Sequence, residues 1–189
     1  MELLFFNAWW MIYNILLAVL AVIFGWLMYL SHKKYVSLLM GAIWLLFIPN
    51  TIYILTDLIH ISNQLPKTTH ALTWILLFQY ALLTFVGILT FFYALLPFEY
   101  ILRRYNFSER KIRVIIVLMN FLFSFGVVLG RIQRTNSWDV FVNIQKVLHD
   151  TVYTLTSGDL ITLTILFGLL CNFVYFLFYD IFPQPKKHK

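Results

Sequence analysis

Between Ala71 and Leu96 the chain reads ALTWILLFQYALLTFVGILTFFYALL, and none of these 26 residues carries a formal charge. As an α-helix, a stretch of this length extends about 39 Å, because each residue rises about 1.5 Å. The hydrocarbon core of a bilayer is about 30 Å thick. The stretch therefore predicts a membrane-spanning helix, which we expect to end at Pro97 because proline breaks the helical hydrogen-bond ladder.

Four further apolar stretches have a similar length, and 61% of the chain is hydrophobic while only 12% is charged. Soluble domains usually carry about 25% charged residues. In one stretch a helix from Val36 to Pro49 would extend only about 21 Å, so we expect it to continue past Pro49 with a kink. The sequence thus predicts an all-α integral membrane protein, one domain over residues 1–189 with about five spans. The predicted spans cover about residues 8–30, 36–55, 71–96, 112–130 and 160–182.

A sixth helical pattern lies at residues 138–155, where apolar residues recur at steps of three and four. Asn136 is placed to cap this segment, with Asp139 three residues further on. We expect an amphipathic helix lying on the outer membrane surface. The alternative is a partly buried sixth helix packed into the bundle. The apolar positions are Phe141, Ile144, Leu148, Val152 and Leu155.

Lysine and arginine are unevenly divided between the two sides that five spans define. One side holds the loops 31–35 and 97–111, Arg113 and the tail from Asp180, with ten basic and three acidic residues. The other side has four basic and five acidic residues. Because cytoplasmic loops are enriched in lysine and arginine, we expect the N-terminus outside and the C-terminus in the cytoplasm. The basic residues flank the spans, so a nucleic-acid partner is not predicted.

Two polar segments then fall together on the outer side. Residues 49–60 read PNTIYILTDLIH, and residues 130–139 read GRIQRTNSWD. In a helix, Tyr53, Asp57 and His60 share one face, since they are spaced i, i+4 and i+7. Arg131 and Arg134 are spaced i, i+3. We therefore expect carboxylates, a histidine and two guanidinium groups to converge in the outer interfacial layer.

The two motifs, Pro-Asn-x-x-Tyr-x-x-Thr-Asp-Leu-x-His at 49–60 and Gly-Arg-x-x-Arg-x-Asn-Ser-Trp-Asp at 130–139, resemble a known family. It comprises small bacterial multi-pass membrane proteins catalogued as domain of unknown function 1361. With the pattern of spans, the resemblance covers nearly the whole chain. It implies a location in the bacterial cytoplasmic membrane. It implies no reaction, cofactor or ligand.

The candidate catalytic residues are Asp57, His60 and Asp139. A histidine oriented by a carboxylate suits a general base, and the same pair suits two ligands of a metal. The simpler explanation is a helix end, where polar residues leave the lipid and bond the loop backbone. A metal site would need third and fourth ligands, and no spacing in the sequence supplies them. We therefore predict neither a metal site nor a cofactor.

The arginines admit two explanations of equal weight. Guanidinium groups bind phosphate well, and lipid headgroups supply phosphate. Alternatively, Arg131 and Arg134 form ion pairs with Asp57 and Asp139 that hold one helical hairpin against another. The candidate ligand-binding residues are Asn50, Tyr53, Arg131, Arg134, Asn136 and Trp138.

Two functions follow from these residues. The first is an accessory envelope protein whose outer cluster holds an anionic group, either a lipid phosphate or the acidic segment of another membrane protein. The second is a membrane-embedded enzyme that acts on a lipid-linked substrate at the outer leaflet. An open pocket lined by Asp57, His60 and Asp139 would favour the enzyme. Direct ion pairs without such a pocket would favour a structural clamp.

Overall fold

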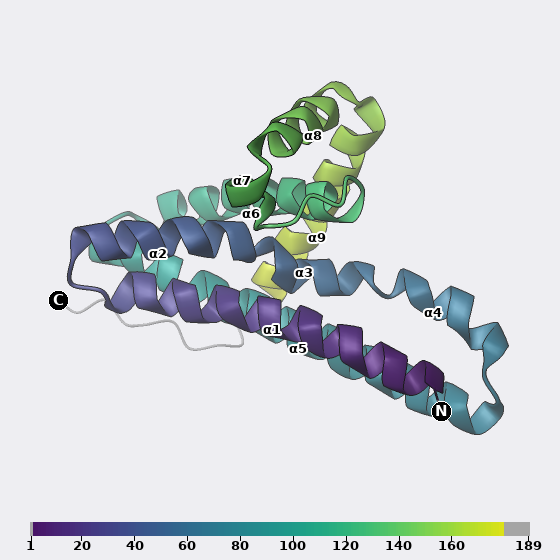
Figure 1. Cartoon of the computed structure of the whole chain (residues 1–189). Coiled ribbons are helices and arrows are strands. Elements are labelled where there is room, and N and C mark those ends of the chain that lie inside the picture. Colours follow the sequence, from purple (N-terminus) through teal and green to yellow (C-terminus); the bar gives the residue numbers. More distant parts are fainter. Residues whose placement is uncertain (1, 180–189) are drawn as a thin grey trace.

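The computed structural model of the chain describes residues 2–179, which are helical with short connecting turns and contain no strand (Figure 1). The predicted all-α fold is therefore confirmed. The helices are α1 (Glu2–Leu30), α2 (Lys34–Phe47), α3 (Pro49–Thr56), α4 (Ile59–Gln64), a 3₁₀ turn (Leu65–Lys67), α5 (His70–Arg104), α6 (Glu109–Arg131), α7 (Asp139–Val142), α8 (Ile144–Thr156) and α9 (Gly158–Tyr179).

Among these residues, five helical segments are long and apolar enough to cross a membrane, as the sequence predicts. The second segment joins α2 and α3 across Pro49, so the helical path continues past the proline. The five segments are Leu4–Leu30, Lys34–Thr56, His70–Arg104, Glu109–Arg131 and Gly158–Tyr179.

One boundary differs from the prediction, because α5 continues through Pro97 to Arg104. A proline inside a helix costs about 3 kcal/mol, chiefly through a lost hydrogen bond and a clash with the preceding turn. Tertiary contacts stabilise the extra turns. The buried Glu99 accepts hydrogen bonds from Arg103, one turn later, and from the Tyr175 hydroxyl of α9. The expected end at Pro97 was therefore wrong.

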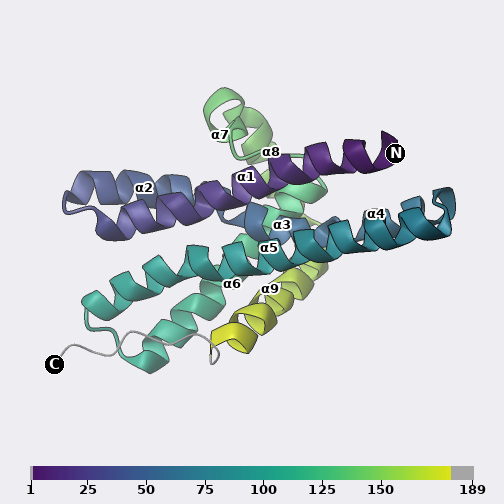
Figure 2. The same ribbon diagram turned by 90° about the horizontal axis from the view of Figure 1, so that it is seen from below.

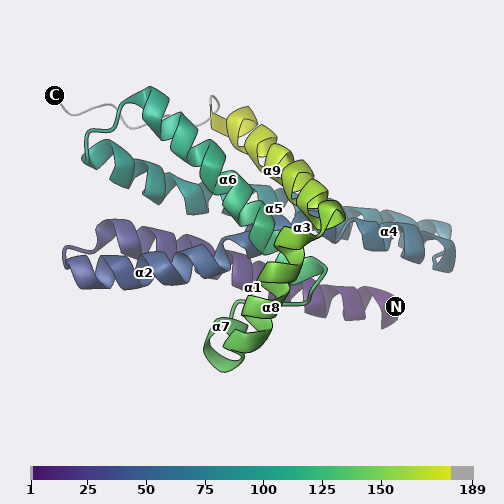
Figure 3. The same cartoon turned by 90° about the horizontal axis from the view of Figure 1, so that it is seen from above.

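The segment α3 occupies the centre of the helical packing. It contacts α1, α5 and α6, and α9 packs against the far side of the bundle, mainly on α6 (Figure 3). Glycine permits the close approach of α3 and α6, because a Cβ atom added to Gly126 of α6 would lie 2.6 Å from Cγ of Pro49. The motif at residues 49–60 is thus held between three long helices.

Polar contacts show which helix ends lie together. Arg103 of α5 donates to the Tyr179 hydroxyl of α9 (3.0 Å), and Arg104 donates to the Tyr29 carbonyl of α1 (3.3 Å). At the opposite end, the Asn7 amide donates to Gln64 (2.7 Å). The helices therefore alternate in direction, as five successive spans require.

The predicted helix at 138–155 is instead two helices, α7 and α8, which protrude from one side of the bundle (Figure 1). Asn143 separates them, and its side chain caps α8 by accepting from the Lys146 N–H (3.2 Å). The apolar positions of this segment are each more than half exposed. They do not pack into the bundle, and a place on the membrane surface stays a prediction. The exposed positions are Phe141, Ile144, Leu148, Val152 and Leu155.

Candidate functional site

The candidate site is built around Pro49. A proline nitrogen carries no hydrogen, so the ladder of helical hydrogen bonds is interrupted at this residue. Side chains from both motifs bond the carbonyl groups next to this break. The Ser137 hydroxyl donates to the Leu46 carbonyl (2.7 Å), and the Asn50 amide donates to the Phe47 carbonyl (3.0 Å). The Asn50 amide also lies 3.3 Å from the Ser137 hydroxyl. These bonds attach the loop after α6 to the kink between α2 and α3.

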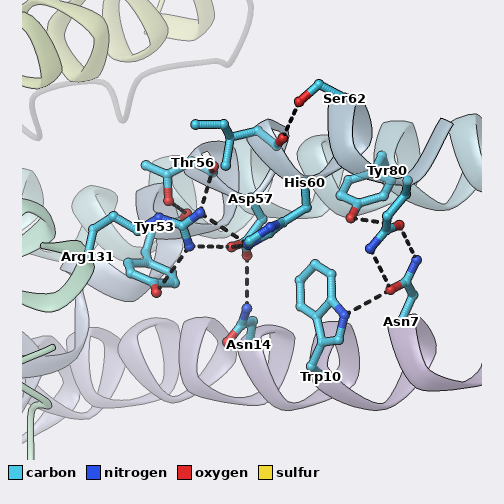
Figure 4. A network of polar contacts seen from close by, with 12 residues as sticks. Asn7, Trp10, Asn14, Tyr53, Thr56, Asp57, His60, Ser62, Tyr80 and Arg131 are labelled. Carbon is cyan, nitrogen blue, oxygen red and sulfur yellow. Dashed lines mark hydrogen bonds and ion pairs between the residues drawn. The ribbon is translucent and has the colours of Figure 1, made fainter. Parts of the chain in front are cut away.

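Arg131, the last residue of α6, is bonded on several sides to α3 and the start of α4 (Figure 4). Its Nη1 donates to Asp57 Oδ1 (3.0 Å) and to the Tyr53 hydroxyl (3.3 Å). Its Nη2 donates to the Thr56 carbonyl (3.4 Å) and lies 3.2 Å from His60 Nε2. The structure thus brings four of the predicted site residues together, with the guanidinium group engaged inside the protein.

Asp57 is the acidic partner of this ion pair, and only 2% of its surface is exposed. Its second oxygen accepts from the Asn14 amide of α1 (2.9 Å). Burial raises the pKa of the Asp57 carboxyl, while the positive charge of Arg131, the neighbouring His60 and the Asn14 donor lower it. The carboxylate therefore joins α1, α3 and α6.

A ring contact, followed by hydrogen bonds, connects this cluster to the start of α1 (Figure 4). The Trp10 ring meets His60 edge-on at 6.0 Å, and its indole N–H donates to Asn7 (3.1 Å). Sequence reasoning missed the asparagines of α1. Their spacing was the available signal, because Asn7 and Asn14 are seven residues apart and so share one helix face.

Arg134 and Asp139 lie outside this cluster, contrary to expectation. Helix α6 ends at Arg131, and Arg134 adopts a left-handed conformation (φ 54°) that turns the chain away. Within residues 2–179 the exposed Arg134 side chain has no hydrogen bond or ion pair. Asp139 accepts from the Asn136 backbone N–H (2.8 Å) and lies 3.8 Å from Lys146 Nζ. The two arginines therefore have different surroundings.

Polar side chains of α8 hold the loop that follows α6. Asp150 accepts from the Thr135 hydroxyl (2.5 Å) and from Lys146 Nζ (2.8 Å). Hydrogen bonds from Lys146 and Thr135 lower the pKa of Asp150 to about 2. Lys146 Nζ also donates to the Gln133 carbonyl (3.3 Å). These contacts were not predicted from the sequence.

A pocket of about 260 Å³ opens between α1, the kink at Pro49, the end of α6 and the loop that follows it. The candidate ligand-binding residues Arg131 and Arg134 are not part of its wall, nor are the candidate catalytic residues. Apolar residues such as Leu17 and Leu46 complete the lining. The polar side chains in the wall belong to Tyr13, Asn14, Asn50, Tyr53, Thr135, Asn136, Ser137 and Trp138.

Asp139 is therefore separated from Asp57 and His60, which lie together beside Arg131. Asp57 accepts hydrogen bonds from Arg131 and Asn14. Asp139 instead accepts from the Asn136 backbone N–H, and in the described chain it forms no hydrogen bond with Asp57 or His60. No group of three or more His, Cys, Asp or Glu side chains in the described residues is arranged to hold a metal ion. The direct ion pair is the arrangement expected of a structural clamp, and the pocket beside it is lined by uncharged groups.

Comparison with known proteins finds no match among curated proteins and none among solved structures. A family model does match, and it covers residues 13–174. The matched region includes α2 to α8, and with them both motifs and the whole wall of the pocket. The chain belongs to the family described as protein of unknown function (DUF1361).

Proposed function

We propose that this membrane protein binds the headgroup of an anionic lipid in the pocket at the Pro49 kink, and that it does so without transforming the ligand. One observation carries the proposal. Two motifs that are far apart in the sequence, at 49–60 and 130–139, supply hydrogen-bonding side chains to a single cavity. Asn50 and Tyr53 come from the first motif, and Asn136 and Trp138 come from the second.

The wall of the pocket suits a polar headgroup attached to an apolar chain. Asparagine amides both donate and accept hydrogen bonds. The volume of about 260 Å³ is just below the range of about 300–1,000 Å³ that holds drug-sized ligands, so a headgroup fits better than a whole lipid. The Asn136 side chain forms no hydrogen bond with the described residues and is exposed, so it is available to a ligand.

Arg134 provides the positive charge for an anionic headgroup. It directly precedes Thr135, which lines the pocket, and its guanidinium group is exposed and unpaired in the described structure. Guanidinium groups match phosphate oxygens with two parallel hydrogen bonds. Arg131 has a different role, because its donors are already bonded to Asp57, Tyr53 and Thr56.

The geometry supports binding better than catalysis. A general base must lie within hydrogen-bond reach of its substrate. Asp57 is buried in an ion pair and Asp139 bonds the backbone of its own turn, so neither reaches the pocket. The accessory role therefore has more support than the enzyme that acts on a lipid-linked substrate.

We further propose that the pocket faces the outside of a bacterial cytoplasmic membrane, with the N-terminus outside. The uneven division of basic residues supports this orientation. The alternating helices support it as well, since the turns at 31–33 and 105–108 lie at one end of the bundle and Asn7 and Gln64 at the other. The family resemblance supports the bacterial location.

Fluorine NMR tests the binding proposal at the pocket itself. All six tryptophans are replaced by 5-fluorotryptophan in protein embedded in phosphatidylcholine nanodiscs, and Trp138→Phe assigns the pocket resonance. We expect short-chain dihexanoyl phosphatidylglycerol to shift the Trp138 resonance. Asn136→Ala should weaken this binding about fivefold, because one hydrogen bond contributes about 1 kcal/mol.

Asn63→Ala is the matched control, since the Asn63 side chain is also exposed and forms no hydrogen bond within residues 2–179. It should leave the titration unchanged. Arg134→Gln should weaken binding of phosphatidylglycerol more than binding of the zwitterionic dihexanoyl phosphatidylcholine. The proposal would be disproved if neither lipid shifted the Trp138 resonance. It would also be disproved if Asn136→Ala bound phosphatidylglycerol with the same affinity as wild type.

A further inference from the structure

A second cavity lies at the opposite end of the molecule, between the α1–α2 hairpin and the α5–α6 hairpin. Figure 2 shows the two hairpins next to each other. The cavity has a volume of about 730 Å³ and is open at the surface. None of its lining residues belongs to either sequence motif. Leu45 is the one wall residue that it shares with the pocket at the Pro49 kink, and we call this second cavity the hairpin groove.

The floor of the hairpin groove is apolar. Met28 and Trp44 are buried there, and Phe98 and Met119 complete the floor. The Trp44 indole N–H already donates to the Ala94 carbonyl (2.8 Å), so it offers no free donor to a ligand. Methionine side chains are flexible and adapt to apolar ligands of irregular shape. A hydrocarbon chain matches this floor.

The rim of the hairpin groove is basic. Lys34 and Arg104 line it on opposite hairpins, together with His32. Lys34 has no acidic partner in residues 2–179. Arg104 has none either, although its guanidinium group is held 4.4 Å over the Tyr29 ring. The rim therefore combines two exposed positive charges.

Acidic residues near this end do not neutralise the rim. Both Glu99 and Glu109 bond Arg103, which leaves no described carboxylate for the rim. The N-terminus of α2 adds further positive potential at Lys34. Its N-cap residue Lys33 makes no side-chain capping bond, and its first turn holds no acidic residue. Free N–H groups at a helix N-terminus bind phosphate well.

We propose that the hairpin groove binds one anionic glycerophospholipid, with the phosphate between Lys34 and Arg104 and an acyl chain along the Trp44 floor. The charge of the rim and the apolar floor match the two halves of such a lipid. Basic pockets between transmembrane helices bind anionic headgroups in this way. The volume lies within the range that holds drug-sized ligands, which is enough for one chain.

The fluorotryptophan protein also reports on this site, because Trp44 lines the hairpin groove whereas Trp138 lines the other pocket. Nanodiscs are prepared with an increasing fraction of dioleoyl phosphatidylglycerol in dioleoyl phosphatidylcholine. We expect the Trp44 resonance to shift and saturate. Lys34→Gln with Arg104→Gln should raise the fraction needed for half of the shift about 25-fold.

Lys111→Gln with Arg113→Gln is the matched control. It removes the same charge from exposed residues of α6 at the same end, and neither residue lines the groove. It should change the titration less than twofold. An equal loss in both double variants would overturn the proposal, because it would show diffuse attraction to the membrane surface.

Ala42→Phe tests the apolar half of the site without changing any charge. Ala42 is exposed and lines the groove, so a larger ring there fills the groove without disturbing the core. It should abolish the saturable shift. A shift that survives Ala42→Phe would overturn the proposal, as would one that pure phosphatidylcholine produces. A Trp44 shift that depends on protein concentration would instead identify a second copy of the chain as the occupant and overturn it too.

Discussion

Replacing Arg131 by methionine leaves the Asp57 carboxylate without its ion-pair partner. Only 2% of Asp57 is exposed, and within the described residues the Asn14 amide remains as its one side-chain hydrogen-bond donor, while His60 Nε2 lies 4.0 Å away. Removing one member of a buried ion pair usually costs about 3–5 kcal/mol, because the other charge stays buried. We expect Arg131→Met to reduce the free energy of unfolding by this amount.

The chain provides its own assay for this loss of stability. Cys171 is its one cysteine and is fully buried, so a dye that fluoresces on reaction with thiols reports unfolding. Heating the protein in detergent with the dye gives the unfolding temperature. Arg131→Met should unfold at a clearly lower temperature than wild type.

A second variant separates the ion pair from simple packing. Asp57→Asn combined with Arg131→Met removes both charges, and the new amide would keep a polar group that can bond Asn14. This double variant should be more stable than Arg131→Met alone, because no charge is left buried. If the double variant is as unstable as the single one, the loss reflects packing of the Arg131 side chain, and the ion-pair explanation is refuted.

The loss in Arg131→Met should also depend on pH. Burial already raises the pKa of Asp57, and Arg131 opposes that rise, so its removal raises the pKa further. A carboxyl whose folded pKa lies above its unfolded pKa loses stability as pH rises between the two values. The variant should therefore approach wild type at pH 5 and fall furthest below it at pH 8. A difference that is constant over this range would contradict the assignment of the buried charge.

Two further predictions concern orientation and packing. In intact cells, a membrane-impermeant maleimide should label Asn63→Cys and not Ser108→Cys, since these exposed residues lie at opposite ends of the bundle; the reverse pattern would invert the proposed topology. Gly168→Ala should destabilise the protein by about 1–3 kcal/mol in the thiol-dye assay, because the added Cβ would lie 2.1 Å from the Phe121 ring. Gly158→Ala, with nothing within 4 Å of its added Cβ, should not destabilise it.

Local patterns were sufficient to predict the five long apolar segments and part of the cluster around Asp57. Hydropathy is read directly from the sequence, so the five long segments were found. The spacing of Tyr53, Asp57 and His60 placed them on one helix face, and the structure brings Arg131 to them, as expected from the sequence.

Features that depend on distant contacts escaped prediction. Helix α5 passes Pro97 because Glu99 meets Tyr175, which is 76 residues away. The pocket depends on the path of the loop after α6, which Ser137 fixes by bonding the Leu46 carbonyl 91 residues earlier. Arg134 lies outside the cluster because the chain turns with a left-handed conformation after α6. No residue pattern at that position indicates such a turn.

Tyr53 belongs both to the pocket at the Pro49 kink and to the contact between α3 and α6. Its ring lines the pocket, and its hydroxyl accepts from Arg131, so it is both a wall for a ligand and part of the attachment between α3 and α6. Any molecule that binds more tightly when this ring is fixed must strengthen the attachment of the two helices by the same free energy. Ligand binding in the pocket and the stability of the contact between α3 and α6 are then thermodynamically linked. Helix α6 would be attached more firmly in the ligand-bound protein than in the ligand-free protein.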